Sequence, residues 1–271
     1  MTLDKDLLKD PRQWQLVMEP GSTALRVLAY SPLEYDALIS VSIPYAADAN
    51  PIRGFKDAIY DNPLLLSDFK SVTILLPTRR FFPIPDLVAT PETREAIFRR
   101  AFPEEDTPTE LITTDLPPLR ASLTMEADKA LLGFIRRTFP NPRILHPLAP
   151  LALYFKAKHP TRPRGKMLAN LRDDRVDIVL LGDEAPLVLN TFAIHDPMDA
   201  VYYIMACREA YALRPTDELI LAGDTASRAA VTPHLRRFIR YVMPAIFPTV
   251  MIRAGRASLT TPFELIVTPL I

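Results

Sequence analysis

Residues 175–205, RVDIVLLGDEAPLVLNTFAIHDPMDAVYYIM, decide the fold that this sequence predicts. They read as two strands, at 176–181 and 187–194, joined by a tight turn and followed by a helix that begins at Pro197. Asp196 and Pro197 favour a helix start, because a capping side chain and a residue without an N–H both suit the first turn. Two strands and a helix in this order are typical of the beginning of a nucleotide-binding α/β lobe.

The same order of elements extends to both sides of this stretch. In the second half, further strands are predicted at 166–172, 218–222 and 263–268, and helices at 197–213 and near 233–242. In the first half, the pattern predicts strands at 14–19, 24–30, 38–45, 71–76, 110–114, 119–125 and 143–145, and helices at 52–60, 92–101, 126–138 and 147–159. The continuous apolar run at 71–76 is typical of a strand buried on both faces of a sheet. Each half therefore reads βββαβα with a further strand.

A polar connection separates the two halves. The stretch 159–166, HPTRPRGK, is basic and contains proline and glycine, which is the composition of a linker between lobes. We therefore predict two domains, at residues 1–160 and 161–271. The predicted fold class is α/β, with two lobes that each contain a mixed sheet.

The composition is that of an ordinary globular protein of 271 residues, with 48% hydrophobic and 24% charged residues. No apolar stretch approaches the ~20 residues that a membrane-spanning helix needs, and the N-terminal residues have no signal-peptide pattern. The one cysteine, Cys207, excludes an internal disulfide and a metal site built from cysteines. These features predict a cytoplasmic protein that does not enter a membrane.

The charges balance overall, with 32 basic and 32 acidic residues, but they are unevenly distributed. Residues 225–263 contain six arginines and no acid. One interpretation is a surface for an acidic protein partner, formed by Arg228, Arg236, Arg237 and Arg240. The alternative is that these arginines cover the solvent side of a helix and its loop. Nucleic-acid binding by this face is disfavoured, because only two aromatic residues, Phe238 and Tyr241, lie among the arginines.

Three short segments bear on a phosphate site. Residues 16–24, LVMEPGSTA, place Gly21, Ser22 and Thr23 in a turn between two strands, directly after Glu19. Residues 170–175, NLRDDR, form the corresponding turn in the second half and contain no glycine. Residues 219–225, LILAGDT, end a strand on a single glycine, Gly223. In addition, residues 144–153, ILHPLAPLAL, step from a strand into a helix before the second half.

This doubled pattern resembles the actin-like ATPase superfamily, which includes actin, heat-shock chaperones, sugar kinases and pilus-assembly proteins. The resemblance implies two ribonuclease-H-like lobes that face each other across a cleft, with nucleotide phosphates held by one hairpin turn from each lobe. In that family an aspartate stands where this chain has Glu19, and glycines stand where this chain has Arg172, Asp173 and Asp174. Glycines let backbone N–H groups approach a phosphate closely, whereas two carboxylates would repel it.

The chain as a whole also resembles an uncharacterised bacterial family with an actin-like fold and no established activity. The segments that carry this second resemblance are 190–192, 199–204 and 219–223. This resemblance implies the fold, but it implies no chemistry.

Other catalytic patterns are absent from the sequence. It contains no GxSxG, GxxxxGK[ST] or GxGxxG motif, and the four histidines lack metal-ligand spacing. Cys207 lies on a predicted helix between tyrosines, where packing is favoured over reactivity. Carboxylates at Glu19, Asp173, Asp174 and Asp224 could gather magnesium, but Asp173 and Asp174 also suit a two-residue hairpin turn. We therefore predict no catalytic residue and no metal site.

Three functional hypotheses follow. The leading one is a non-catalytic module for protein interaction or assembly, similar to a pseudo-ATPase, with no cofactor. The alternative is an ATPase or kinase that binds a nucleotide or sugar phosphate. Its cofactors would be ATP and magnesium, held by Gly21, Ser22, Thr23, Arg172 and Gly223. The third hypothesis is nucleic-acid binding through the arginine-rich face.

Overall fold

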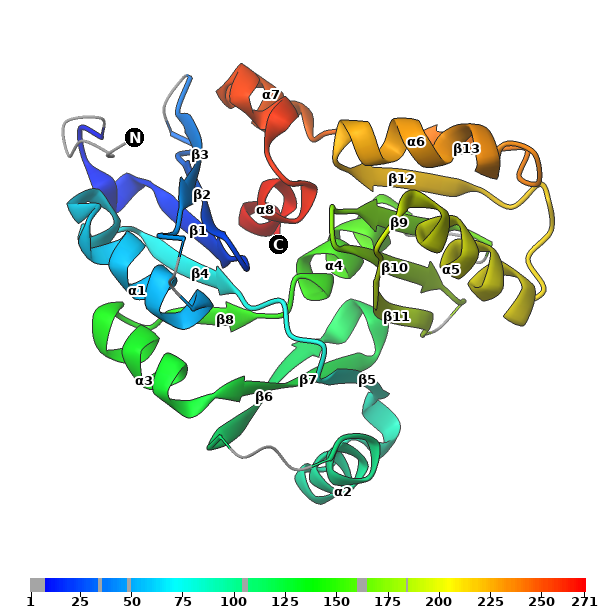
Figure 1. Cartoon of the computed structure of the whole chain (residues 1–271), viewed down its shortest axis with the longest axis horizontal. Helices are drawn as coiled ribbons and strands as arrows, with labels where there is room; N and C mark the ends of the chain where they lie inside the picture. Colours follow the sequence, from blue (N-terminus) through cyan, green and yellow to red (C-terminus); the bar gives the residue numbers. More distant parts are fainter. Residues whose placement is uncertain (1–7, 34–35, 48–49, 104–106, 160–164, 184) are drawn as a thin grey trace.

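The computed structural model describes residues 8–33, 36–47, 50–103, 107–159, 165–183 and 185–271. It contains two lobes, each built on a five-stranded mixed sheet (Figure 1). In the first lobe the strand order is β3-β2-β1-β4-β8. The elements are β1 (Gln15–Pro20), β2 (Ala24–Tyr30), β3 (Leu38–Pro44), α1 (Pro51–Tyr60), β4 (Ser71–Leu75) and β8 (Arg143–Leu145).

The second lobe repeats this topology, with the strand order β11-β10-β9-β12-β13. In both sheets the first three strands are antiparallel, and the remaining two run parallel to the central strand. The predicted α/β fold with two lobes of the βββαβα type is therefore confirmed. The elements are β9 (Met167–Leu171), β10 (Arg175–Leu181), β11 (Pro186–Ala193), α5 (Pro197–Ala210), β12 (Leu219–Gly223), α6 (Thr225–Leu235) and β13 (Val242–Pro244).

A smaller unit is inserted in the first lobe between β4 and β8. It is a three-stranded sheet of order β5-β7-β6 with helix α2 beside it, whereas α3, which follows β7, lies near α1 and β8 of the first lobe (Figure 1). The sequence pattern missed β5, because its two prolines argue against a strand. β5 lies at an edge of its sheet, where a missing N–H is tolerated. The elements are β5 (Phe81–Pro85), α2 (Pro91–Ala101), β6 (Thr109–Leu116), β7 (Ala121–Asp128) and α3 (Lys129–Thr138).

The last part of the chain corrects two expectations. The segment 263–268 is not a strand of the second sheet, because α8 (Phe263–Val267) is a buried helix that packs on α4 and on strands β1 and β2. A short, mostly apolar run fits a strand and a buried helix equally well, so periodicity alone could not separate them. The helix predicted near 233–242 is also wrong: α6 ends at Leu235, and residues 242–244 form β13. A further helix, α7 (Thr249–Ala254), precedes α8.

The two lobes share part of their core around α4 (Leu148–Lys158), which contacts α8, β10 and β11. Alternation along β10 divides its side chains between two environments. Val176, Ile178 and Leu180 pack with α5 in the core of the second lobe, whereas Val179 and Leu181 join the larger core of the first lobe. The inner face of β10 therefore points between the lobes.

The predicted linker falls mostly on residues 160–164, which lie outside the described residues, as does the predicted domain boundary at 160/161. Among the residues that the structure describes, no helix is long and apolar enough to cross a membrane.

Candidate functional site

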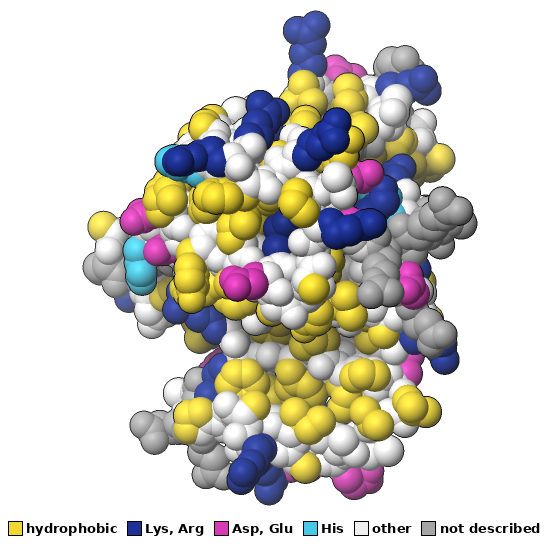
Figure 2. Space-filling view, turned by 90° about the vertical axis from the view of Figure 1, so that its right-hand side faces the viewer, with side chains coloured by type: hydrophobic (Ala, Val, Ile, Leu, Met, Phe, Trp, Pro, Cys, Tyr) yellow, Lys and Arg dark blue, Asp and Glu magenta, His cyan; other side chains and the backbone are white. Residues whose placement is uncertain are grey.

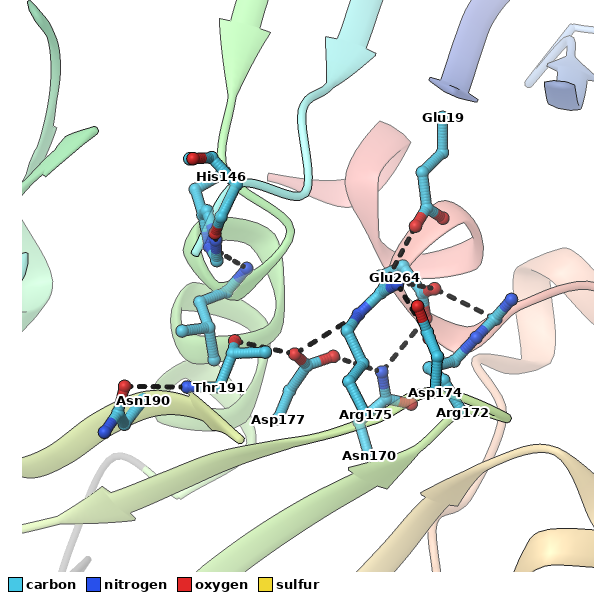
Figure 3. Close-up of polar contacts among 12 residues, drawn as sticks. Glu19, His146, Asn170, Arg172, Asp174, Arg175, Asp177, Asn190, Thr191 and Glu264 are labelled. Carbon is cyan, nitrogen blue, oxygen red and sulfur yellow. Dashed lines mark hydrogen bonds and ion pairs between the residues drawn. The ribbon is translucent and has the colours of Figure 1, made fainter. Parts of the chain in front are cut away.

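A cluster of buried charged residues lies where the β1–β2 hairpin of the first lobe faces the β9–β10 hairpin of the second lobe (Figure 3). Glu19, near the end of β1, is fully buried and points toward Arg175 at the start of β10. Arg175 Nη2 donates to Glu19 Oε1 at 2.6 Å. The first hairpins of the two lobes are thus joined directly by an ion pair.

Arg175 contacts further carboxylates on the same inner face. Its Nε lies 3.6 Å from Asp177 Oδ1, and its Nη2 lies 3.8 Å from Glu264 Oε1 of α8. At the outer end of the turn, Nη1 lies 3.5 Å from Asp174 Oδ1. This guanidinium therefore links residues of three separate chain segments.

Cross-strand pairing places a row of polar side chains behind Arg175. Asp177 is the register partner of Asn170 on β9 and of Thr191 on β11. Its carboxylate accepts from Asn170 Nδ2 at 3.0 Å and from Thr191 Oγ1 at 2.8 Å. Asn170 Nδ2 also donates to Glu264 Oε2 at 3.1 Å. The row holds Asp177 in one orientation toward the guanidinium of Arg175.

Arg172 forms the second ion pair of the cluster. Its Nη1 lies 2.9 Å from Glu264 Oε1, and only 3% of the Arg172 side chain is exposed. Asp224, after the end of β12, is a more distant partner at 3.9 Å. Helix α8, although it follows the second lobe in sequence, therefore supplies the carboxylate that both arginines share.

Three buried carboxylates, Glu19, Asp177 and Glu264, face the buried arginines Arg172 and Arg175. The partly exposed Arg26 also lies near Glu19, with its Nη1 3.6 Å from Oε1. Burial, followed by repulsion from Glu264, raises the pKa of Glu19 to about 7. Burial also raises the pKa of Asp177. Burial opposes the ionisation of Glu264 too, but Arg172 and Arg175 outweigh it and lower the pKa of this carboxyl. Glu19 therefore takes up a proton near neutral pH.

The raised pKa of Glu19 predicts that the free energy of unfolding depends on pH, and that the substitution Glu19→Gln removes this dependence. Between the ordinary value of 4.5 and about 7, the folded chain binds the Glu19 proton more tightly than the unfolded chain. The stability that this proton contributes is full below pH 4.5 and lost by about pH 7, with a slope of about 1.4 kcal/mol per pH unit for each proton. Relative to the wild type, the stability of the variant should rise across this window.

Urea titrations at several pH values measure this difference. The stability of Glu19→Gln must be compared with that of the wild type at each pH, because a second buried group, His146, also makes stability depend on pH. Burial lowers the pKa of His146 to about 3. Its neutral form therefore adds stability that grows as the pH rises from about 3 to 6.5, opposite in sign to Glu19. A constant difference between Glu19→Gln and the wild type from pH 4.5 to 7 would contradict the assignment.

A cavity of about 600 Å³ opens beside the cluster, between the first lobe, the inserted sheet and the 173–175 turn. Its walls include the first turns of α1 and α3 and the residues just before α4. His146 lines it with a fixed tautomer, because Nδ1 accepts from Leu148 N at 3.2 Å and Nε2 therefore donates to Thr78 O at 3.0 Å. Its polar lining is mixed in charge, with Arg26, Arg79, Arg80 and Arg175 opposite Glu126, Asp128, Asp173 and Asp174.

The structure separates the five residues that the sequence singled out for a phosphate. Gly21, Ser22 and Thr23 line the cavity. Arg172 lies outside this lining, paired with Glu264, and Gly223 also lies outside it. Gly223 has a φ of +93°, and a Cβ there would come within 1.9 Å of Leu171 O, so this glycine allows β12 to approach β9. Whether any of the five residues holds a nucleotide stays a prediction.

Sequence comparison gives this molecule a family. Residues 8–242 match the model of DUF3822, a family described as proteins of unknown function. The chain belongs to the DUF3822 family. No curated protein matches it significantly.

Two solved structures place this DUF3822 protein among actin-like folds. A Bacteroides thetaiotaomicron protein, described as having an actin-like ATPase fold and unknown function, is 20% identical, with a TM-score of 0.77 over 96% of this chain and 97% of that one. PilM, solved in the PilM–PilN type IV pilus biogenesis complex, is 13% identical, with a TM-score of 0.54 over 95% of this chain and 97% of that one. At these identities the likeness shows the fold, in agreement with the resemblance read from the sequence.

Sequence reasoning missed three members of the DUF3822 protein's buried cluster, namely Asn170, Asp177 and Glu264. A signal was present, because Asp177 interrupts an apolar strand and Glu264 an apolar helix, and buried charges require partners. Among the described residues, no group of three or more His, Cys, Asp and Glu side chains could hold a metal ion. The predicted two-residue turn at Asp173 and Asp174 is confirmed, since Arg172 N donates to Arg175 O at 2.9 Å.

Proposed function

We propose that this chain is a pseudo-ATPase, an actin-like module that acts by binding another protein and does not hydrolyse nucleotide. The observation that carries the proposal is the 2.6 Å ion pair between Glu19 and Arg175. It connects the two turns between which a member of the superfamily would hold its phosphates. Arg172 and Glu264 form a second buried pair beside it.

A triphosphate at this position would meet unfavourable electrostatics. Both guanidinium groups are already engaged by buried carboxylates. Adding several negative charges beside Glu19, Asp177 and Glu264 would increase repulsion in a region with little water. In the second turn, the backbone N–H of Arg172 donates a hydrogen bond to Arg175 O, and no glycine is present. The backbone therefore lacks the close approach that a phosphate loop needs.

A protein-binding role agrees with the same fold in a known complex. PilM, which shares this fold at a TM-score of 0.54, is solved in complex with PilN. This supports the idea that an actin-like chain can act as one partner of an assembly. Folds of this kind host many functions, so the role has to be tested on this chain.

The first test is a thermal-shift titration of the whole chain with ATP, ADP and GTP, each with magnesium, to about 5 mM. A ligand at 100 times its dissociation constant would stabilise the folded state by about 2.7 kcal/mol. We expect no shift with any nucleotide, because both arginines are engaged by buried carboxylates and the second turn has no glycine. A concentration-dependent rise in Tm would overturn the proposal.

The cavity favours one alternative, a ligand that carries a nucleotide or sugar phosphate beside Ser22, Thr23 and Arg26. The double variant Ser22→Ala/Thr23→Ala and a surface control show whether a nucleotide-induced rise in Tm comes from this site or from a general effect of salt. If a nucleotide raises the Tm of the wild type and Ser22→Ala with Thr23→Ala removes the rise, this alternative replaces the pseudo-ATPase. The exposed surface variant Arg143→Glu provides the control.

A further inference from the structure

We propose that residues 236–241 and the hollow beside them form a docking surface for an acidic segment of a partner protein. We call this the basic docking surface, defined by Arg236, Arg237, Phe238, Arg240 and Tyr241. The inference rests on the proposed function, because it names the kind of partner that a protein-binding module would take.

Unneutralised positive charge is the first observation. Some exposed arginines elsewhere pair with carboxylates, as Arg99 does with Glu95 and Arg136 with Glu110. Within the described chain, the exposed residues Arg236, Arg237 and Arg240 have no carboxylate within 4 Å. The absence of any acid from 225 to 263 explains this. Figure 2 shows dark-blue basic side chains among yellow apolar ones over the upper part of this side of the molecule.

Arg228, the fourth arginine of the predicted face, has a different role. Its Nε donates to Gly223 O at 3.1 Å and its Nη2 to Thr225 Oγ1 at 3.2 Å. This side chain therefore binds the start of its own helix, and we leave it out of the surface.

Exposed aromatic residues and a hollow are the second observation. Phe238 is 57% exposed and Tyr241 is 42% exposed, with the Arg240 guanidinium 5.4 Å from the centre of the Tyr241 ring. Phe238 borders a hollow of about 300 Å³, which has room for an apolar side chain. The other lining residues are Met205, Arg208, Glu209, Leu213 and Pro215, of which Glu209 is the only acid.

The surface is held rigidly on the second lobe. Ile239, in the middle of the segment, is 1% exposed and anchors it in the core. Arg240 N donates to Pro215 O at 2.9 Å, and Tyr241 O accepts from Leu219 N at 2.9 Å. A preorganised surface loses little conformational entropy when a partner binds.

The chemistry favours a protein partner over nucleic acid. Met243 on β13 and Ile246 just after it, 38% and 85% exposed, continue the surface. Nucleic-acid interfaces are polar and strongly positive, whereas this surface mixes arginine with aliphatic side chains on a chain of zero net charge. Protein interfaces combine an apolar anchor in a pocket with surrounding charge. The occupant is therefore an acidic segment with an aromatic or aliphatic anchor that enters the hollow.

An array of synthetic peptides, each about 12 residues long, tests this with the full chain. Each peptide carries Asp and Glu around one varied apolar residue, and matched sets replace the acids with Asn and Gln or with Lys. We expect binding only to acidic peptides with a large anchor. The Arg237→Glu/Arg240→Glu double variant and Phe238→Ser should each weaken it at least tenfold. The control Arg100→Glu/Arg143→Glu, at exposed arginines elsewhere, should change it less than twofold.

Two results would overturn the inference. One is that no acidic peptide binds the wild type below about 1 mM. The other is that a 20-nucleotide single strand of RNA or DNA binds more tightly than any peptide and is lost in the same variants. All substituted side chains are exposed, so the variants should keep the Tm of the wild type. If the peptides do not bind, the result of the nucleotide titration is unaffected, so the proposed function can still hold. If a nucleotide raises the Tm, the proposed function is wrong, but the peptide-binding result is unaffected.

Discussion

Arg175→Met is expected to lower the free energy of unfolding by about 3–5 kcal/mol, the typical effect of removing one partner from a buried ion pair. The Arg175 side chain is only 10% exposed. Without it, Arg172 would be the one buried guanidinium among the described residues left near Glu19, Asp177 and Glu264, with the partly exposed Arg26 beside Glu19. Methionine preserves most of the apolar volume, so the loss reports charge and hydrogen bonding more than packing. Urea denaturation at pH 7.5 measures the change.

Two comparisons identify the cause. The double variant Arg175→Met/Glu19→Gln should recover part of the loss, because it removes one of the uncompensated carboxylates. Arg136→Met breaks an exposed pair with Glu110, whose two side chains are 49% and 38% exposed, and should cost no more than about 1 kcal/mol. If Arg175→Met were as mild as Arg136→Met, the buried cluster would not be a structural centre.

Gly223→Ala is expected to destabilise the protein by about 3 kcal/mol or more, because two backbone effects combine at this residue. The φ of +93° is a conformation that side chains disfavour. The added Cβ would lie 1.9 Å from Leu171 O and 2.5 Å from Leu171 N, both backbone atoms of the neighbouring strand. β12 would have to move away from β9, weakening the hydrogen bond from Asp224 N to Leu171 O. Thermal and urea unfolding measure the loss.

Gly133→Ala is the matched control for this substitution. Its Cβ would meet the end of the flexible Arg137 side chain, at 3.1 Å. Alanine within a helix is favoured over glycine by about 0.5–1 kcal/mol, so this variant should be neutral or slightly stabilised. Equal losses in the two variants would show that Gly223 has no special backbone role.

Local patterns accounted for most of the fold and for few of the site residues. The strand over Ala24–Tyr30 and the N-terminus of α5 were predictable because alternation and capping depend on neighbouring residues. β5 and α8 were not, because an edge position and burial against a distant helix overrode their local pattern. The same limit applied to Glu264, which reaches the site only because α8 packs between the lobes.

The sequence by itself determined the doubled order of strands and helices and the lack of glycine in the second turn, since both are properties of adjacent residues. Only the tertiary structure decided that Glu19, Arg175 and Glu264 meet, because a buried charge must find a partner wherever packing provides one. Those residues are separated by most of the chain, and no local pattern encodes their distance. The buried ion pairs of Glu19, Arg175 and Glu264 therefore became visible only when both lobes and the C-terminal helix were in place.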